Sequence, residues 1–252
     1  TLVGTVTLAG YSSLTPWPQI VAGLDLVRDG HDTTVNMTYS FIPAGTYVTQ
    51  SGDVSVTLND HVDGVGTAGH VSTADFQNQI RYAFSQWKAA FESVYSVAGG
   101  APANLTLNFN ETAETGTRAL FDPYSVGEDG TGDFRVGMWE QGVEDNGGLV
   151  LAYAYGPNAA PSMVSGDILF NSSADWKLDA NLTDGMAGST PNGYSIVFVA
   201  VHELGHSLGF GHHVSSSSIM APVAGTHHQF SSFFPTGLAG STYTRTMIKG
   251  VY

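Results

Sequence analysis

The chain contains no cysteine among its 252 residues. Disulfide bonds and any regulation through a cysteine thiol are therefore excluded, because both need the sulfur of that side chain. The absence does not place the protein inside the cell, because secreted proteins without disulfides exist as well.

Positive charge is scarce as well. The chain has 8 Lys and Arg against 22 Asp and Glu, which gives a formal net charge of −14. This balance argues against a nucleic acid or an anionic membrane as partner. It is typical of a soluble surface, and it also suits the binding of calcium. No run of 18 apolar residues occurs, so we expect no membrane span.

The composition predicts a soluble globular protein. Hydrophobic residues make up 42% and charged residues 12% of the chain, which is long enough for one large domain or two small ones. Because the sequence begins at Thr1 rather than at a methionine, we expect that a signal or pro-segment has been removed.

The most informative stretch is residues 202–212, which read His-Glu-Leu-Gly-His-Ser-Leu-Gly-Phe-Gly-His. His202 and His206 are four residues apart, so on a helix both imidazoles reach one metal ion. Gly209 suits the end of that helix, because glycine enters the left-handed conformation without steric cost. His212 then arrives as a third ligand from outside the helix. Three protein ligands leave a fourth position of zinc open, which is typical of a catalytic site.

Glu203 lies between the two helical histidines, where it can take a proton from a water that zinc activates. The alternative is a buried helix with incidental polar residues, since the apolar run 196–201 comes just before. That helix would bury three histidines and a glutamate without a metal to satisfy them, which is costly. We therefore favour a zinc enzyme with Glu203 as its catalytic residue.

A second motif follows the third histidine. Residues 218–222 read Ser-Ile-Met-Ala-Pro and resemble the Met-turn of the metzincins, in which the methionine lies beneath the zinc-binding histidines. A lone methionine is otherwise core filler, but Met220 has both the position and the neighbours of the motif. With the zinc motif, it identifies the chain as similar to M10-type metzincin zinc metalloproteases, a matrixin- or serralysin-like catalytic domain of bacterial type.

This resemblance implies an α+β metzincin fold: a mixed twisted sheet with an antiparallel edge strand, an active-site helix, a backing helix and a C-terminal helix. The periodicity of apolar residues agrees with it. Strands are predicted over 35–41, 105–109, 133–138 and 149–157, and helices over 73–97, 194–208 and 241–252.

Two parts are predicted along the chain. Residues 1–35 are expected to be an N-terminal extension or propeptide remnant, with a short helix over 20–27. Residues 36–252 form the catalytic domain, within which 43–72 are interpreted as an insertion.

The segment 149–157 resembles the edge strand above the matrixin cleft. An edge strand has unpaired N–H and C=O groups, to which an extended peptide can add. By this resemblance Leu151 and Ala152 are the backbone partners of the substrate. Pro222 and Val223 are expected to line the pocket for the residue beyond the scissile bond.

The chain departs from both families at several positions. Tyr153 and residues 168–169 replace the histidines of the matrixin structural zinc, so we predict that this second zinc is absent. Asn171 and Ala174 stand where matrixins have calcium-binding acids, which weakens that site. Serralysins have an extra tyrosine ligand where this chain has Pro222.

An acidic cluster comes before Gly147, and its oxygen atoms suit Ca²⁺. It comprises Glu140, Glu144, Asp145 and Asn146. A solvated acidic loop explains the same residues equally well, so both interpretations stay open.

The resemblance implies a secreted zinc metalloendopeptidase that hydrolyses extended protein or peptide substrates and needs no nucleic acid or membrane. We expect a monomer. One alternative is a non-catalytic binding or surface-assembly protein on this scaffold, with residues 1–72 as its interaction part. Another is a zinc enzyme that acts on a non-peptide amide.

Overall fold

The structure is a computed structural model, and every structural statement below concerns the residues that it describes. These are residues 9–10, 16–44, 55–56, 72–114, 133–139, 150–157, 165–174, 176–178, 193–213, 215–222 and 236–252. Val223, the acidic cluster at 140–146 and most of the predicted insertion at 43–72 lie outside these ranges.

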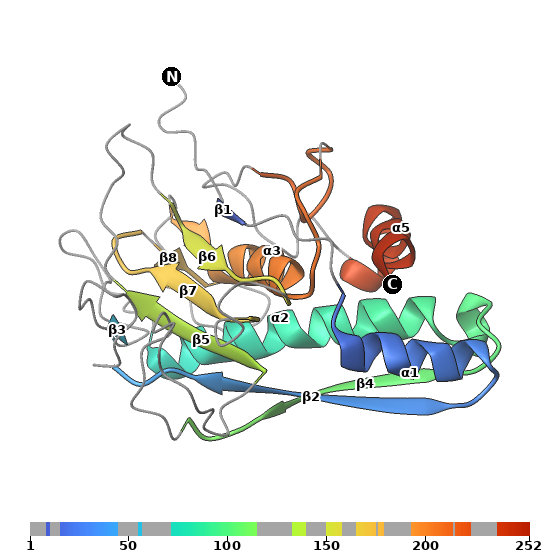
Figure 1. The fold of residues 1–252 in the computed structure, drawn as a ribbon. Coiled ribbons are helices and arrows are strands. Elements are labelled where there is room, and N and C mark those ends of the chain that lie inside the picture. Colours follow the sequence, from blue (N-terminus) through green and yellow to red (C-terminus); the bar gives the residue numbers. More distant parts are fainter. Residues whose placement is uncertain are drawn as a thin grey trace.

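A mixed sheet of seven described strands forms one layer of the molecule (Figure 1). Its order is β1 (Ala9–Gly10), β6 (Ala152–Ala154), β7 (Ile168–Asn171), β5 (Phe134–Trp139), β2 (Thr33–Phe41) and β4 (Leu105–Glu111), and β3 (Ser55–Val56) also pairs with β5. Neighbouring strands are parallel, except that β6 is antiparallel to β7 and β3 is antiparallel to β5. The mixed sheet with an antiparallel strand near one edge is therefore confirmed. A separate parallel pair joins β8 (Trp176–Lys177) to β9 (Tyr194–Ser195).

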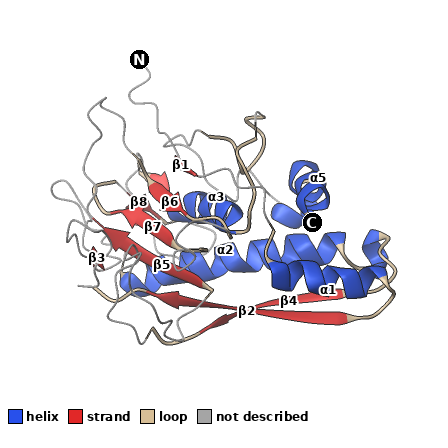
Figure 2. Cartoon of the chain, viewed as in Figure 1, coloured by secondary structure: helices blue, strands red, loops and turns tan. Residues whose placement is uncertain are grey.

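The described helices pack on this sheet and on one another (Figure 2). They are α1 (Pro18–Arg28), α2 (Thr73–Val94), α3 (Ile196–Ser207) and α5 (Thr242–Val251), with short 3₁₀ turns η1 (Val97–Gly99) and η3 (Leu238–Gly240). Helix α2 packs against β4, α3 packs against both α2 and β6, and α5 packs against α2. The backing, active-site and C-terminal helices expected from the sequence are thus α2, α3 and α5.

Helix α2 forms because one of its faces is apolar and its first turn is capped. The Ser72 hydroxyl accepts a hydrogen bond from the Asp75 N–H, as expected of an N-cap. The buried face includes Phe76, Ile80, Ala83, Phe84, Trp87 and Phe91. The helix ends at Val94 rather than at the predicted Val97, because the Ser96 side chain caps the separate turn η1.

Helix α1 belongs to the main core. Its side chains Ile20, Leu24 and Val27 are buried in the cluster that also holds the apolar residues of α2 and α3. The short helix predicted over 20–27 is confirmed. The assignment of residues 1–35 as an extension or remnant stays a prediction, but the residues of α1 are packed as part of the domain.

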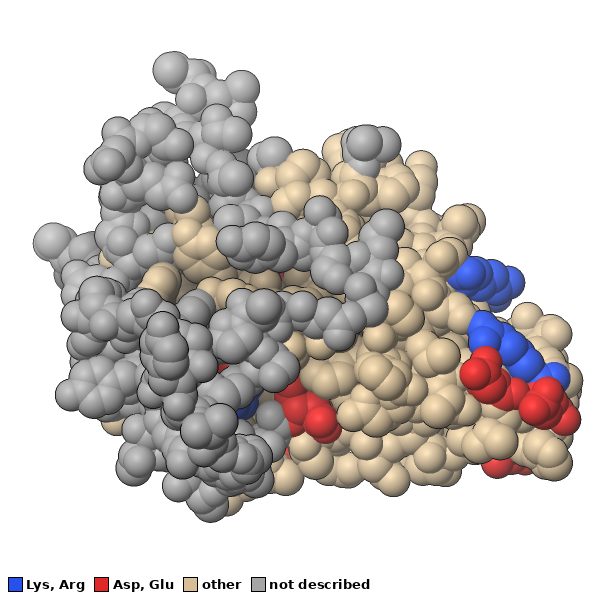
Figure 3. Space-filling view, viewed as in Figure 1, with Lys and Arg blue, Asp and Glu red and all other residues tan. Residues whose placement is uncertain are grey.

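Two further observations concern the sheet and the surface. In place of the histidines of the matrixin structural zinc, Tyr153 pairs with Leu169, and the Tyr153 ring lies 6.2 Å from the ring of Trp139. On the face drawn in Figure 3, the Lys and Arg of the described residues are few and lie near Asp and Glu.

None of the described helices combines the length and the apolar character needed to cross a bilayer.

Candidate active site

Helix α3 contains the first two candidate ligands, His202 and His206, and is buried. The Ser195 hydroxyl caps it by accepting a hydrogen bond from the Phe198 N–H at 3.2 Å. Every residue from Ile196 to Ser207 is buried. A helix that is buried on all sides is held by packing rather than by its own propensity. Its polar residues therefore occupy fixed positions.

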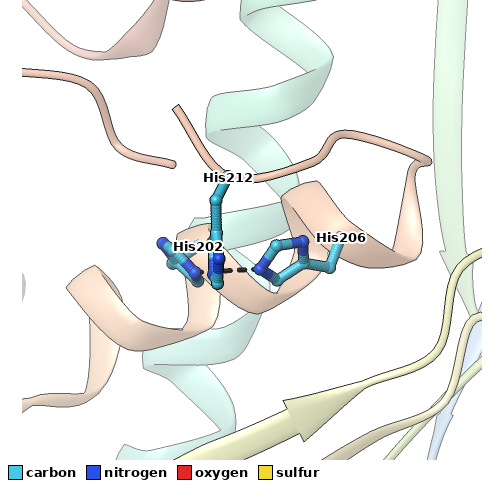
Figure 4. Close-up of side chains that lie close together, drawn as sticks. All are labelled: His202, His206 and His212. Atoms are coloured by element: carbon cyan, nitrogen blue, oxygen red, sulfur yellow. Dashed lines mark hydrogen bonds between the residues drawn. The ribbon is translucent and has the colours of Figure 1, made fainter. Parts of the chain in front are cut away.

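Three imidazoles meet beside this helix (Figure 4). The Nε2 atoms of His202 and His206 are 3.0 Å apart, and one nitrogen from each of the three histidines lies within 4.8 Å of the others. Tetrahedral zinc with Zn–N bonds of about 2.0–2.1 Å places its nitrogen ligands about 3.3 Å apart. His202 and His206 are buried, while His212 is exposed and comes from the segment after the helix. The three sequence-predicted ligands are therefore brought together in a set that fits a metal ion.

The other ring nitrogens of the two helical histidines face backbone carbonyls. His202 Nδ1 lies 2.6 Å from the Ile219 carbonyl oxygen, and His206 Nδ1 lies 2.7 Å from that of Phe210. A carbonyl oxygen only accepts, so each Nδ1 carries the proton and each Nε2 keeps its lone pair. This is how ligating histidines are usually oriented.

The surroundings of the triad favour neutral imidazoles. Burial lowers the pKa of His202 well below its ordinary value, and nearby His206 lowers it further. Burial, followed by the influence of His212, lowers the pKa of His206 to about 4, and burial also lowers that of His212. A metal binds the neutral form of histidine, so the three side chains are in the ligand form at neutral pH.

The turn after α3 delivers the third histidine. Gly209 has φ of 93°, and its N–H donates to the His206 carbonyl at 2.8 Å. The Phe210 N–H donates to the Gly205 carbonyl at 2.9 Å. This pair of bonds is the Schellman motif, which needs the left-handed conformation that glycine adopts most readily. The chain then reverses and places His212 over the helix, as predicted.

Glu203 follows His202 on helix α3 and is buried there. It has no solvent exposure, and neither carboxylate oxygen has a hydrogen-bond partner among the described residues. Burial raises the pKa of this carboxyl group well above its ordinary value. A buried polar group without a partner is costly. A cation on the adjacent histidines, with its water, is a partner that fits this set of donor atoms.

Met220 lies directly against the active-site helix. A Cβ atom added to Gly205 would be 2.3 Å from the Met220 Sδ, so the helix backbone and this side chain are in close contact. The turn is fixed on its other side, because the His213 N–H donates to the Met220 carbonyl at 2.7 Å. The segment that holds Met220 also supplies the Ile219 carbonyl that receives His202.

The residues predicted to bind substrate are partly described. Leu151 and Ala152 are buried, and the Leu151 carbonyl accepts the Asn171 N–H at 2.8 Å. The side of β6 away from β7 is paired with β1. Pro222 is exposed, directly after the Met220 turn. The role of these residues in substrate binding stays a prediction.

The sequence interpretation missed four groups that support the site. The carbonyls of Phe210 and Ile219 orient the helical histidines, and the side chains of Trp17 and Tyr252 bond to the end of α3. A backbone carbonyl has no residue-type signal. Buried aromatic residues, conversely, are common in any core, so neither kind of group stands out in a sequence.

Comparison with known proteins places this site in a family. The family model described as Matrixin matches residues 64–233, which is about two thirds of the chain. Matrilysin of Rattus norvegicus is 34% identical over 117 residues, covering 44% of this chain and 39% of that protein. Matrix metalloproteinase-26 of Homo sapiens is 30% identical over 105 residues, covering 40% and 35% respectively.

A bacterial relative matches over a longer stretch. Karilysin of Tannerella forsythia is 24% identical over 162 residues, which is 62% of this chain and 26% of karilysin. In each of these three relatives the match spans less than two fifths of the relative's own length. The family match includes the helix, the turn and all three histidines, and the chain belongs to the matrixin family of peptidases.

Proposed function

We propose that the protein is a zinc-dependent endopeptidase that cleaves extended protein or peptide substrates. The observation that carries this proposal is the convergence of three imidazoles at a helix that also buries the Glu203 carboxyl group, for which the described residues provide no hydrogen-bond partner. Membership of the matrixin family supports it.

Each site residue has a distinct role in this proposal. His202, His206 and His212 would hold zinc through the nitrogens that face one another. Zinc, when bound, supplies a Lewis acid that polarises a carbonyl and makes water more acidic. Glu203 takes a proton from the attacking water and then gives it to the leaving amine. Its burial keeps the carboxylate in place and excludes competing solvent.

The substrate is proposed to lie along β6. Leu151 and Ala152 provide the backbone at this side of the sheet, and Pro222 with Val223 borders the position beyond the scissile bond. In the described structure β1 pairs with Tyr153 and Ala154 of this strand. A peptide that adds here by main-chain hydrogen bonds competes with β1.

Secretion and a monomeric state belong to the same proposal, whereas binding of calcium stays open. The matrixin family supports an extracellular protease. The candidate calcium cluster at residues 140–146 lies outside the described residues, so its test is binding of calcium by the intact chain.

The two alternatives differ from the proposal in turnover. A non-catalytic binding protein would have no function for a buried Glu203 that finds no hydrogen-bond partner among the described residues, and burial of such a group is costly. An enzyme for a non-peptide amide would use the same ligands but would leave protein substrates intact. Zinc content alone does not separate these functions.

The test is cleavage of denatured casein by the zinc-loaded protein, with and without a chelator. We expect cleavage that stops on chelation and returns when zinc is added. Two neighbouring histidines provide a matched pair of variants. His212→Ala should lose zinc and activity, whereas His213→Ala should keep both, because His213 Nδ1 accepts the Ser215 N–H instead. Absence of cleavage by a zinc-loaded wild type would contradict the proposal.

A further inference from the structure

The end of the active-site helix is held by two aromatic residues from opposite ends of the sequence. Trp17 precedes α1, and Tyr252 follows α5. We infer that Trp17 and Tyr252 are positioning residues, which bond to the last carbonyls of α3 and thereby keep His206 and His212 in their metal-binding arrangement. This inference rests on the proposed zinc site and adds to it.

The carbonyls at the end of α3 can be accounted for one by one. Those of Leu204, Gly205 and His206 accept N–H groups of the following turn, from Leu208, Phe210 and Gly209 respectively. The next two carbonyls, of Ser207 and Leu208, have no backbone donor in this turn, as is usual at a helix C-terminus. Because both residues are buried, these oxygens need partners from elsewhere in the fold.

Trp17 and Tyr252 provide these partners. The Trp17 indole Nε1–H donates to the Ser207 carbonyl at 2.7 Å. The Tyr252 hydroxyl donates to the Leu208 carbonyl, also at 2.7 Å. The same hydroxyl accepts the Trp17 backbone N–H at 3.2 Å, so the two residues are linked to each other. Burial raises the pKa of Tyr252, which keeps its hydroxyl protonated as a donor.

Trp17 and Tyr252 bond to the start of the turn that connects α3 to His212. The Phe210 carbonyl receives the Nδ1–H of His206, and His212 follows two residues later. The Phe210 ring stacks on Trp87, with centroids 5.0 Å apart, and lies 5.9 Å from the ring of Tyr252. A shift of this turn would therefore change the hydrogen bond that orients His206 and the path of the chain to His212.

Helix α1 strengthens this connection. The Arg28 side chain donates a hydrogen bond to the Tyr252 backbone carbonyl, and it also pairs with Asp25 at 2.7 Å. Arg28 of α1 and Tyr252, which follows α5, are thus joined to each other, and Tyr252 also bonds to the end of α3. Folding of α1 onto the domain and formation of a complete metal site are coupled through these bonds.

The test compares zinc dissociation from the intact, zinc-loaded chain in variants that remove single hydrogen bonds. Trp17→Phe and Tyr252→Phe remove the two donors and keep the rings. Mutation of a residue that orients a metal ligand typically lowers the metal affinity by about 10- to 100-fold. We expect zinc to dissociate about 10-fold faster in each variant, measured by transfer to a chromogenic chelator. The visible spectrum of the cobalt-substituted protein should change as well.

Two matched controls lose an equivalent bond elsewhere. Trp176→Phe removes an indole N–H that donates to the Asn171 carbonyl at 2.9 Å. Tyr39→Phe removes a hydroxyl that bonds to Glu111 at 3.1 Å. Both controls should lower the unfolding temperature but leave zinc dissociation and the cobalt spectrum unchanged. If Trp17→Phe fails to fold, Arg28→Ala serves in its place. Arg28 is half-exposed, so its truncation opens no cavity but removes the hydrogen bond to the Tyr252 carbonyl, and it should also speed zinc loss.

The outcomes separate this inference from the proposed function. A wild type that binds zinc and cleaves casein, with test variants that release zinc at the control rate, would overturn the inference alone. A wild type that does not bind zinc at all would overturn the proposed function. Faster zinc loss in the test variants and not in the controls supports the inference, and cleavage of casein by the wild type supports the proposed function.

Discussion

Gly205 and Met220 are in such close contact that a Cβ atom added to Gly205 would lie 2.3 Å from the Met220 Sδ. The ring of Trp87 lies on the same side, 2.9 Å from that added atom. Helix α3 thus has room only for a glycine one residue before His206, which is proposed to bind the metal. The methionine turn and the backing helix α2 both pack against this point.

Gly205→Ala is therefore expected to displace Met220 and to destabilise the protein by about 1–3 kcal/mol, the usual cost of overpacking a core. Gly250→Ala, at an exposed position of helix α5, is the matched control because nothing lies within 4 Å of its added Cβ. That change should be neutral or stabilising by up to about 1 kcal/mol, since alanine favours a helix more than glycine does. Urea unfolding of both variants measures the difference. Equal stability of the two would show that the contact is loose.

The stability of the metal-free protein is expected to fall as the pH drops from about 6.5 towards 4. The pKa of His206 is about 4 in the folded protein and 6.5 in its ordinary state. Above pH 6.5 neither state binds this proton. Between the two values the unfolded chain is protonated while the folded protein is not, so the free energy of unfolding decreases. This one imidazole contributes at most about 3 kcal/mol, from about 1.4 kcal/mol per pH unit.

Unfolding of the chelator-treated protein across this pH range measures the effect. His206→Gln removes one of the titrating imidazoles and should make the pH dependence less steep, while His202 and His212, whose pKa values are also lowered, still contribute. His31→Gln, at an exposed position, controls for the loss of a histidine as such. A His206→Gln variant with the slope of the wild type would contradict the assignment.

Removal of residues 1–15 is expected to raise kcat/KM for a peptide substrate. Strand β1 occupies the side of β6 on which the substrate is proposed to add. A substrate can add only to molecules in which β6 is not paired with β1, and the fraction of such molecules sets the apparent affinity for substrate. Removal of β1 should therefore raise kcat/KM by about three- to tenfold. The cut must precede Trp17, because that residue bonds to the end of α3.

The truncated protein needs its own control. Its zinc content and unfolding temperature should match those of the intact chain, because the cut removes no side chain of the described core. An unchanged KM and kcat in a truncated protein that retains its fold would show that β1 does not obstruct the substrate.

A feature of the structure is predictable from the sequence when the residues that determine it lie close together in the chain. The convergence of the three histidines was predictable, because the spacing of His202 and His206 fixes their common helical face and Gly209 marks the turn. The helix α2 was predictable from its apolar periodicity, although its end was not, since the Ser96 cap of η1 decides it.

The supporting contacts were not predictable in this way. Trp17 and Ser207 are separated by 190 residues, and Leu208 and Tyr252 by 44. Only the packing of α1 and α5 brings them together. The register of β1 against β6 is likewise a tertiary feature, which a two-residue strand cannot specify by its own pattern.

The most direct test of the proposed mechanism compares Glu203→Gln with the wild type at equal zinc content. Glutamine keeps the shape of the side chain but cannot accept the proton of the attacking water. Loss of a general base typically lowers the rate by about 10²- to 10⁴-fold. We expect that loss in kcat/KM for an internally quenched peptide, with zinc still bound. A variant that retains its zinc and cleaves at the wild-type rate would contradict the assignment of Glu203 as the catalytic base.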